Sequence, residues 1–531
     1  MSHGERAIVR LGLLQRCLSV IVFAVLLLSR IAVAGGTDAT ARITVTAFTV
    51  EGNTLLDARD VDRVLSPYKG KALTFQGIRG VADALTRAYL DHGWFTVRVL
   101  VPQQRIGADG IVRLYVVQNK LGTFKVAGNK NYASPLLRHY FDDALRDPYP
   151  RREKFERAVL LVNELRGMKA STVIEPGEKP ETVDVTLNVE DHNPMGFGVD
   201  FNNYGARLNG YNRPGATAHF GNLTGAADEL VMHGFQSLAA QGVFTGVVAY
   251  THPLGYDGTK LVASYSNAAF AVGQELQALD IRGTAAVYGL QISHPFIREP
   301  QHDLDLQAGF LVQNIHNSLF GIENSRDYLR AVQVGFTTAH TDSDGRWIGG
   351  VRLIQDLGLW VGGMRTNDPR STNAAGGGFD VWLADLARVQ RLGQHSLLLL
   401  RGSTQISTQR LPTANQYGLG GVDTVRGYFQ ASYLGDSGYN VNAEFRYMPI
   451  AEHPETLAIT AFVDHGAAWQ LRAPPGSIPS IDLTGAGLGF RLNPTKDMTL
   501  NFDLGYPIGN NFLTRTQGRH LVPYIFFSND F

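Results

Sequence analysis

Met498-Thr-Leu-Asn-Phe-Asp-Leu-Gly-Tyr506 alternates between apolar residues and polar or small ones over its whole length. Successive side chains of an extended strand point to opposite faces, so the apolar side chains share one face and the other carries Thr499, Asn501 and Asp503. The stretch Tyr439–Tyr447 alternates in the same way. A strand with one apolar face suits a transmembrane β-barrel, in which that face contacts lipid and the polar face lines a wet lumen.

The same pattern continues through the chain from about residue 193 to its end. Segments of about ten residues alternate and are separated by turns rich in Gly, Asn, Asp and Pro. We count sixteen candidate strands, an even number, as a single-chain bacterial barrel requires. They begin near residues 194, 213, 228, 241, 259, 281, 303, 326, 344, 376, 395, 438, 456, 482, 497 and 521. The predicted fold class is therefore mainly β, with a 16-stranded antiparallel transmembrane β-barrel over residues 193–531.

Aromatic residues near the ends of these segments suit the interface girdles of a membrane barrel. The tryptophans in question are Trp347, Trp360, Trp382 and Trp469. Any one of them alone is better explained by ordinary strand packing.

Two similar units precede the barrel region. Phe48–Asn53 and Phe124–Asn129 share the pattern F-x-V-x-G-N and lie 76 residues apart. Each is followed by an apolar helical stripe, the first of which starts after Thr74, a suitable N-cap residue, and each stripe is followed by two strands. We predict two small α/β domains with the element order β-α-α-β-β, over residues 43–120 and 121–192. An exposed sheet edge in such a domain can accept an incoming strand, although a rigid spacer is the simpler alternative.

The N-terminus has the pattern of a secretory signal peptide over residues 1–34. Three arginines precede the apolar run Leu18–Leu28, and Ala32-Val33-Ala34 offers a cleavage site of small residues. The only cysteine, Cys17, lies inside this segment, so the mature chain is predicted to have no disulfide and no cysteine-metal site. No other stretch approaches a transmembrane helix, so a membrane location for this exported protein requires a barrel.

Composition argues against several other classes of protein. The chain has 48 basic and 48 acidic residues, and it therefore lacks the basic excess of a nucleic-acid binder. No G-x-x-x-x-G-K-[ST] loop for nucleotide phosphates occurs. We predict no enzyme activity, cofactor or metal, because no Ser-His-Asp or paired-carboxylate arrangement stands out and the histidines lack metal-ligand spacing. These scattered histidines include His252, His294, His340 and His465.

One stretch, GGVDTVRGYFQ at Gly420–Gln430, combines a charge with a glycine-rich setting in the longest gap between the late strands, about residues 407–437. Its central motif is Val425, Arg426, Gly427 and Tyr428. On the strand after next, three residues share the face that should line the lumen: Phe462, Asp464 and Gly466. Because a lumenal carboxylate can meet Arg426 only if the loop folds inward, we predict an inward-folded loop and an Arg426–Asp464 pair. Such a pair could act in transport or merely brace the barrel.

These motifs resemble those of a known superfamily. A VRGY loop before the last strands, F-x-D-x-G two strands later and a sixteen-stranded barrel are similar to the outer-membrane assembly-factor superfamily, whose front domains are POTRA domains. Two POTRA domains resemble the branch of two-partner secretion transporters, of the hemolysin secretion/activation type. Asn203–Gly205 and Phe220–Asp228 also look like early-barrel segments of that branch.

The resemblance implies a protein-transport pore in the outer membrane. Its POTRA domains would lie in the periplasm and capture an unfolded, large exoprotein, and Arg426 would lie at the loop tip inside the pore and pair with Asp464. Phe531, the last residue, looks like the C-terminal signal by which bacterial barrels are recognised by the barrel-assembly machinery. The implied partners are thus the exoprotein, outer-membrane lipid and, during biogenesis, that machinery.

One feature departs from the family pattern. Such transporters usually carry an N-terminal helix that plugs the barrel, whereas only Gly35–Arg42 separate the predicted signal from the first strand. We therefore expect either that the plug is absent or that this is a divergent branch, so that the inward loop alone closes the pore. Two alternatives stay open: a superfamily member that assembles or inserts other outer-membrane proteins, which usually has more POTRA domains, and a passive porin, which needs neither POTRA domains nor a VRGY loop.

Overall fold

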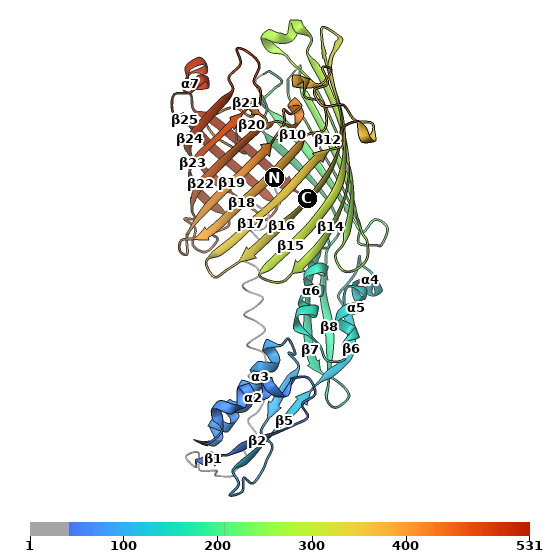
Figure 1. Cartoon of the computed structure of the whole chain (residues 1–531), viewed down its shortest axis with the longest axis vertical. Helices are drawn as coiled ribbons and strands as arrows, with labels where there is room; N and C mark the ends of the chain where they lie inside the picture. Colours follow the sequence, from blue (N-terminus) through green and yellow to red (C-terminus); the bar gives the residue numbers. More distant parts are fainter. Residues whose placement is uncertain (1–41, 207, 240) are drawn as a thin grey trace. The chain divides into compact units, whose positions relative to one another are not determined.

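Figure 1 shows the computed structural model, which describes residues 42–206, 208–239 and 241–531. The chain divides into two compact units, Met1–His192 and Asn193–Phe531. The predicted signal peptide and residues 35–41, on which the expectation of a missing plug depends, lie outside the described residues. Within the described ranges, no helix combines the length and the apolar character needed to cross a membrane.

The first module, residues 43–118, is a three-stranded sheet with helices packed on it. The strand order is β2-β5-β4, in which β5 runs parallel to β2 and antiparallel to β4, and β1 and β3 form a separate pair. The predicted element order is found, with this short pair as an addition. The elements are β1 (Ile43–Val45), β2 (Ala47–Glu51), α2 (Ala58–Leu65), η1 (Ser66–Tyr68), β3 (Lys71–Leu73), α3 (Phe75–Asp91), β4 (Val97–Leu100) and β5 (Ile111–Gln118).

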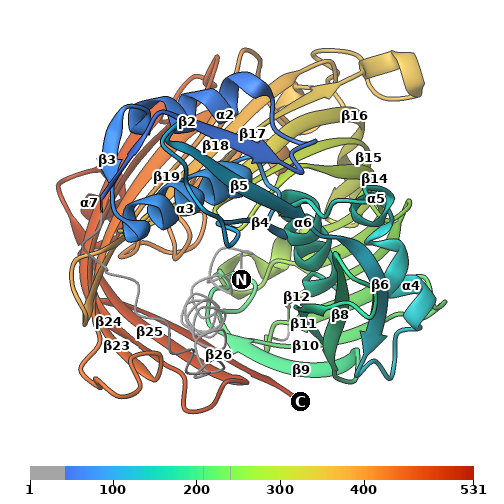
Figure 2. The same cartoon turned by 90° about the horizontal axis from the view of Figure 1, so that it is seen from below.

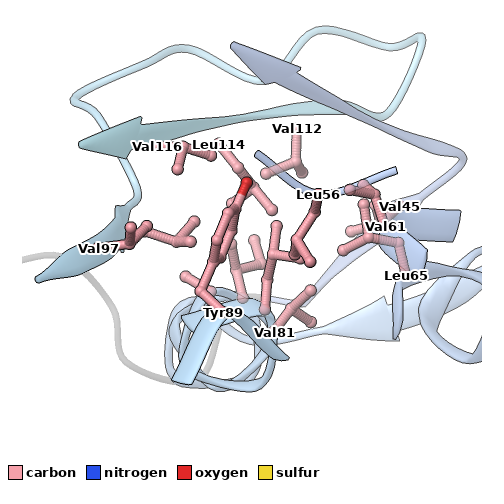
Figure 3. Packing of buried hydrophobic residues seen from close by; sticks show 14 residues of the cluster. Val45, Leu56, Val61, Leu65, Val81, Tyr89, Val97, Val112, Leu114 and Val116 are labelled. Carbon is pink, nitrogen blue, oxygen red and sulfur yellow. The ribbon is translucent and has the colours of Figure 1, made fainter. Parts of the chain in front are cut away.

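The core of this module forms where α3 lays its apolar stripe on the sheet, as Figure 3 shows for Val81 and Tyr89 against Leu114 and Val116. The helix begins at the predicted N-cap, because the Thr74 hydroxyl accepts a hydrogen bond from the backbone N–H of Gly77 at 3.1 Å. Burial raises the pKa of Tyr89 to about 12, so its hydroxyl keeps its proton at neutral pH.

The second module, residues 120–191, repeats this topology. Its strands lie in the order β6-β8-β7, with β6 parallel and β7 antiparallel to β8. Only Asn119 separates β5 from β6, so the two sheets are joined without a flexible linker. The elements are β6 (Lys120–Ala127), α4 (Ser134–His139), α5 (Asp142–Arg146), α6 (Arg152–Asn163), β7 (Met168–Pro176) and β8 (Thr182–Asp191).

The second unit is a closed antiparallel barrel of sixteen strands, seen end-on as a ring in Figure 2. Neighbouring strands follow chain order, except that β22 follows β19, and β26 closes the ring by pairing with β9. The predicted number of strands is confirmed. The strands are β9 (Met195–Asn202), β10 (Arg213–Gly221), β11 (Glu229–Gln236), β12 (Val243–Pro253), β13 (Lys260–Ala271), β14 (Arg282–Arg298), β15 (His302–Leu319), β16 (Ile322–Thr341), β17 (Gly345–Asp356), β18 (Asp380–Arg391), β19 (Ser396–Ser407), β22 (Ser437–Tyr447), β23 (Leu457–Trp469), β24 (Ser480–Leu492), β25 (Met498–Ile508) and β26 (Val522–Asp530).

The predicted phase of the strands is also confirmed. On β22 the apolar residues Val441 and Phe445 are exposed on the outside, while Asn440 and Glu444 are buried toward the lumen. The largest errors in the predicted strand starts are four residues, at β16 and β18. At β16 the predicted start was too late, because the polar residues near the tip of the β15–β16 hairpin have the composition of a turn.

Long connections lie at the end of the barrel opposite to that at which β9 begins. Two of them matter below: the β17–β18 loop (residues 357–379) and the lumenal loop (residues 408–436). Gly376–Gly378 belongs to the first. The short elements of these connections are η2 (Gln274–Leu279), η3 (Gly358–Val361), η4 (Thr372–Ala374), η5 (Thr413–Asn415), β20 (Tyr417–Leu419), β21 (Tyr433–Gly435) and α7 (Phe512–Gln517).

Candidate functional site

The lumenal loop holds its motif against the inner wall of the barrel. Its short strands β20 and β21 pair with each other, and both contact β23. Between them the chain turns sharply at Gly420, Gly421 and Gly427, whose φ angles of +102°, +102° and +103° suit glycine alone. The loop thus holds Val425–Tyr428 at a defined position on the lumenal surface.

Arg426 meets the predicted partner. Its Nε lies 2.8 Å from Oδ2 of Asp464 and its second terminal nitrogen 3.0 Å from Oδ1, which is the bidentate geometry that a guanidinium favours with a carboxylate. The backbone N–H of Arg426 also donates to Asp464, at 3.1 Å. Asp464 is fully buried, and Arg426 is 5% exposed. The pair is therefore a desolvated clamp between the loop and β23.

Phe462 and Gly466, the other predicted lumenal residues, form together with Asp464 the seat of the loop on β23. The guanidinium carbon of Arg426 lies 3.4 Å from the centre of the Phe462 ring, a close cation–π contact. A side chain at Gly466 would come within 2.8 Å of Leu419 on β20. The three residues of this motif thus accommodate the loop in different ways. Asp464 pairs with the charge of Arg426, the ring of Phe462 packs on its guanidinium, and Gly466 leaves room for Leu419.

Arg426 also belongs to a larger network that sequence reasoning missed. Its guanidinium lies 2.7 Å from Glu444 on β22 and 3.4 Å from Asp503 on β25. Arg491 on β24 pairs with Glu444 at 3.2 Å and with Asp503 at 2.8 Å, and Arg446 pairs with Glu444 at 2.7 Å. Together with Asp464, the network contains three guanidinium groups and three carboxylates from four strands and the loop. Its charges balance, which is what burial of so many ions requires.

Glycines on β24 and β25 make room for the loop. A side chain at Gly485 would overlap the carbonyl oxygen of Arg426. At Gly505 it would come within 2.5 Å of the backbone nitrogen of Gly427, and at Gly427 itself within 2.8 Å of Pro507. The loop backbone therefore lies directly on the backbone of the wall, which only glycine permits.

Tyr428 and Tyr524 hold the loop from the side of β26. The backbone N–H of Gly427 donates to the Tyr524 hydroxyl at 3.0 Å, and that hydroxyl donates to the carbonyl of Tyr428 at 2.5 Å. The Tyr428 hydroxyl accepts a hydrogen bond from Asn511 at 2.9 Å. Val425, the remaining motif residue, is fully buried in an apolar cluster with Leu419.

The base of the lumenal loop is fixed by a second buried carboxylate. Asp436, 1% exposed, accepts hydrogen bonds from the backbone N–H groups of Leu411 and Leu471 and from the Gln416 amide, at 2.9, 2.6 and 3.1 Å. The β17–β18 loop also touches this base, because the Thr413 N–H donates to the Thr372 hydroxyl at 2.9 Å.

Phe531 lies at the seam where the barrel closes. Its backbone N–H donates to the carbonyl of Phe197 at 2.7 Å, and the two rings stack with their centres 6.4 Å apart. Its side chain is 75% exposed. In the described ranges of the chain, no group of three His, Cys, Asp or Glu residues is arranged to hold a metal ion.

A sixteen-stranded membrane barrel, preceded by two small α/β modules and holding a charged loop against its lumenal wall, defines a class of outer-membrane protein transporter. Comparison with known proteins identifies the family. Residues 181–492 match the model for the haemolysin secretion/activation protein ShlB/FhaC/HecB, and residues 43–119 match the ShlB-type POTRA domain.

Relatives of established name agree with this assignment. The chain is 23% identical over 406 residues to the outer membrane transporter CdiB of Escherichia coli, covering 74% of this chain and 67% of that one. It is 22% identical over 403 residues to the hemolysin transporter protein HpmB of Proteus mirabilis, covering 73% and 69%. The solved structure of CdiB from Escherichia coli shares the fold, with a TM-score of 0.75 at 21% identity over 100% of this chain and 99% of that one.

The chain therefore belongs to the haemolysin secretion/activation (ShlB/FhaC/HecB) family. It is an outer-membrane transporter of the two-partner secretion type, with its barrel in the outer membrane and its POTRA region in the periplasm. Since β9 follows the second module after three residues, the end of the barrel at which β9 begins faces the periplasm, and the long loops face the cell exterior.

Proposed function

We propose that the lumenal loop is the gate of this transporter and that it shifts when a large exoprotein passes through the barrel. The observation that carries the proposal is the burial of Arg426 among three carboxylates on β22, β23 and β25. An exposed cation in a wet pore would need no such partners. The arrangement suits a loop that ion pairs hold firmly in one position. When the loop leaves this position, Arg426 and the carboxylates can exchange each other for water.

The periplasmic modules supply the capture step in this proposal, with residues 43–120 and 121–192 as two POTRA domains. The open edges of their sheets are β2 and β4 in the first module and β6 and β7 in the second. Such edges can pair with an unfolded, β-prone segment of the exoprotein by strand addition. Because the outer membrane offers no ATP, folding of the exoprotein outside the cell would drive its transport.

Secretion by an Arg426→Ala variant tests the proposed gate. The loop of this variant loses its fixed seat, so we expect a barrel that inserts normally but secretes poorly. Insertion is measured by heat-modifiable migration on gels, and secretion by the exoprotein in the medium. Normal secretion would exclude the proposed role, and a barrel that fails to insert would show that the ion network braces the fold instead.

The network decides which companion variant is informative. An exchange of charges between Arg426 and Asp464 would place a carboxylate at 426, beside Glu444 and Asp503, so it cannot restore the native ion pairs. Arg426→Lys keeps the charge and loses the bidentate fork. We expect its secretion to lie between that of the wild type and that of Arg426→Ala.

Biogenesis supplies a further partner. We propose that Phe531, exposed at the barrel seam, is the C-terminal signal that the barrel-assembly machinery recognises.

A further inference from the structure

The β17–β18 loop carries a short apolar turn outside the site described above. The segment Leu357–Met364 contains no charged residue. Within it, η3 exposes three large apolar side chains: Leu359, Trp360 and Val361 are 67%, 94% and 46% exposed. Trp360 was predicted to lie near the end of a strand, where it would suit an interface girdle, and the structure places it on this turn, four residues after β17 ends.

This turn is held rigidly, so the exposure is not that of a loose loop tip. Buried Asp356 accepts hydrogen bonds from the backbone N–H groups of Gly358, Gly378 and Arg330, at 2.8, 2.7 and 2.8 Å. Gly358 and Gly362 have φ angles of +56° and +77°, which bend the chain at both ends of η3. The fold thus presents three apolar side chains in a fixed position.

The turn lies at the outer rim of the lipid-facing surface of the barrel. On β16 the outward-facing residues Phe336, Val334 and Val332 form an exposed apolar row, and the next one toward the cell exterior is Arg330. The backbone N–H of Leu357 donates to the carbonyl of Arg330 at 2.7 Å, so η3 starts where this row ends.

The apolar turn also lies on a defined side of the barrel wall. In Figures 1 and 2 the gold segment that follows β17 projects beyond the ring of strands, away from the lumen. The apolar turn therefore continues the surface that already faces lipid, at the depth where the membrane meets the exterior. Tryptophan is enriched at that depth because its ring is amphipathic.

We propose that η3 is a membrane anchor, whose partner is the acyl-chain and headgroup boundary of the outer leaflet. Trp360 and its two apolar neighbours insert there, and Asp356 holds the turn to the barrel wall. The same loop contacts the base of the lumenal loop further along, through Thr372 and Thr413. The anchor thus fixes the depth of a loop that supports the gate, although the proposal does not depend on gate movement.

A spin label at position 360 tests this proposal on the full-length protein. The chain has a single cysteine, Cys17, so Cys17→Ser provides a background for single labels. Trp360→Cys is labelled with a nitroxide in nanodiscs that hold one chain each. Collision rates are measured with oxygen, which concentrates in the bilayer, and with a water-soluble nickel chelate. Val463→Cys on the lipid face of β23 and Ser477→Cys in the exposed β23–β24 loop serve as lipid and water references.

We expect the ratio of oxygen to nickel collisions at position 360 to approach that at 463. A ratio equal to that at 477 would overturn the proposal, because the turn would then lie in water. Protection seen only in discs that hold two chains would overturn it as well, since a second copy would then be the partner. If Trp360→Cys fails the heat-modifiability test of folding, Leu359→Cys and Val361→Cys report on the same turn.

Discussion

Removal of the Arg426 side chain should release the lumenal loop from its seat. Arg426→Ala leaves Asp464, a fully buried carboxylate, with the hydrogen bond from the backbone N–H of residue 426 but without those from the guanidinium. Breaking a buried ion pair from one side costs about 3–5 kcal/mol. Arg446 and Arg491 still hold Glu444 and Asp503, so we take the lower figure of about 3 kcal/mol, which corresponds to a rise of roughly 100-fold in the undocked population.

Thiol labelling measures this population. Leu419 on β20 is fully buried while the loop is docked, so a Leu419→Cys reporter in the Cys17→Ser background reacts with a maleimide only after undocking. We expect Arg426→Ala to speed up labelling by roughly 100-fold, in line with the free-energy cost of the broken pair. Arg352→Ala, which removes an exposed lumenal arginine on β17, is the matched control and should leave the rate unchanged. Equal rates in the wild type and in Arg426→Ala would refute the reasoning.

Three further predictions follow from other parts of the structure. Gly485→Val places a side chain on the carbonyl of Arg426 and should expose the Leu419→Cys reporter even though Arg426 and Asp464 are both present. Phe531→Ser should lower the yield of heat-modifiable barrel in cells, without changing the labelling of the barrels that do form. In the second module, burial alone would raise the pKa of Asp191, but hydrogen bonds from Asn131 and three backbone N–H groups hold this pKa below its ordinary value. The stability that Asp191 provides is therefore full above its unfolded pKa of about 3.9 and lost as pH falls through the lower folded value. Urea unfolding followed by helical circular dichroism should show a larger loss of stability between pH 6 and pH 2 in the wild type than in Asp191→Asn, and equal pH dependence would contradict this.

Strand phase explains why so much of the barrel could be predicted. Alternation in Met498–Tyr506 and Tyr439–Tyr447 assigns each side chain to lipid or lumen without knowledge of neighbouring strands. That phase was enough to place Asp464 in the lumen, where Arg426 meets it. Strand ends were less certain where polar residues extend a hairpin beyond the membrane, as in β16.

The rest of the site depends on relations between strands. Glu444 and Asp503 were recognisable as lumenal, but their approach to Arg426 depends on the register of β22, β24 and β25, which alternation does not define. Arg491 was missed for the same reason. The lumenal glycines of β24, Gly485 among them, alternate with larger residues and could have indicated a wall that another backbone approaches.

A reversible cross-link between the gate and the wall tests the central claim most directly. The Asn442 amide on β22 donates to the carbonyl of Thr424 in the loop at 2.6 Å, so Thr424→Cys with Asn442→Cys can be joined by a short bis-methanethiosulfonate reagent. Val247→Cys with Ser266→Cys joins neighbouring lumenal positions of β12 and β13 and serves as the control. If the lumenal loop must shift, joining 424 to 442 abolishes secretion, reduction restores it, and the control pair secretes throughout. Undiminished secretion by the joined 424–442 transporter would contradict the account.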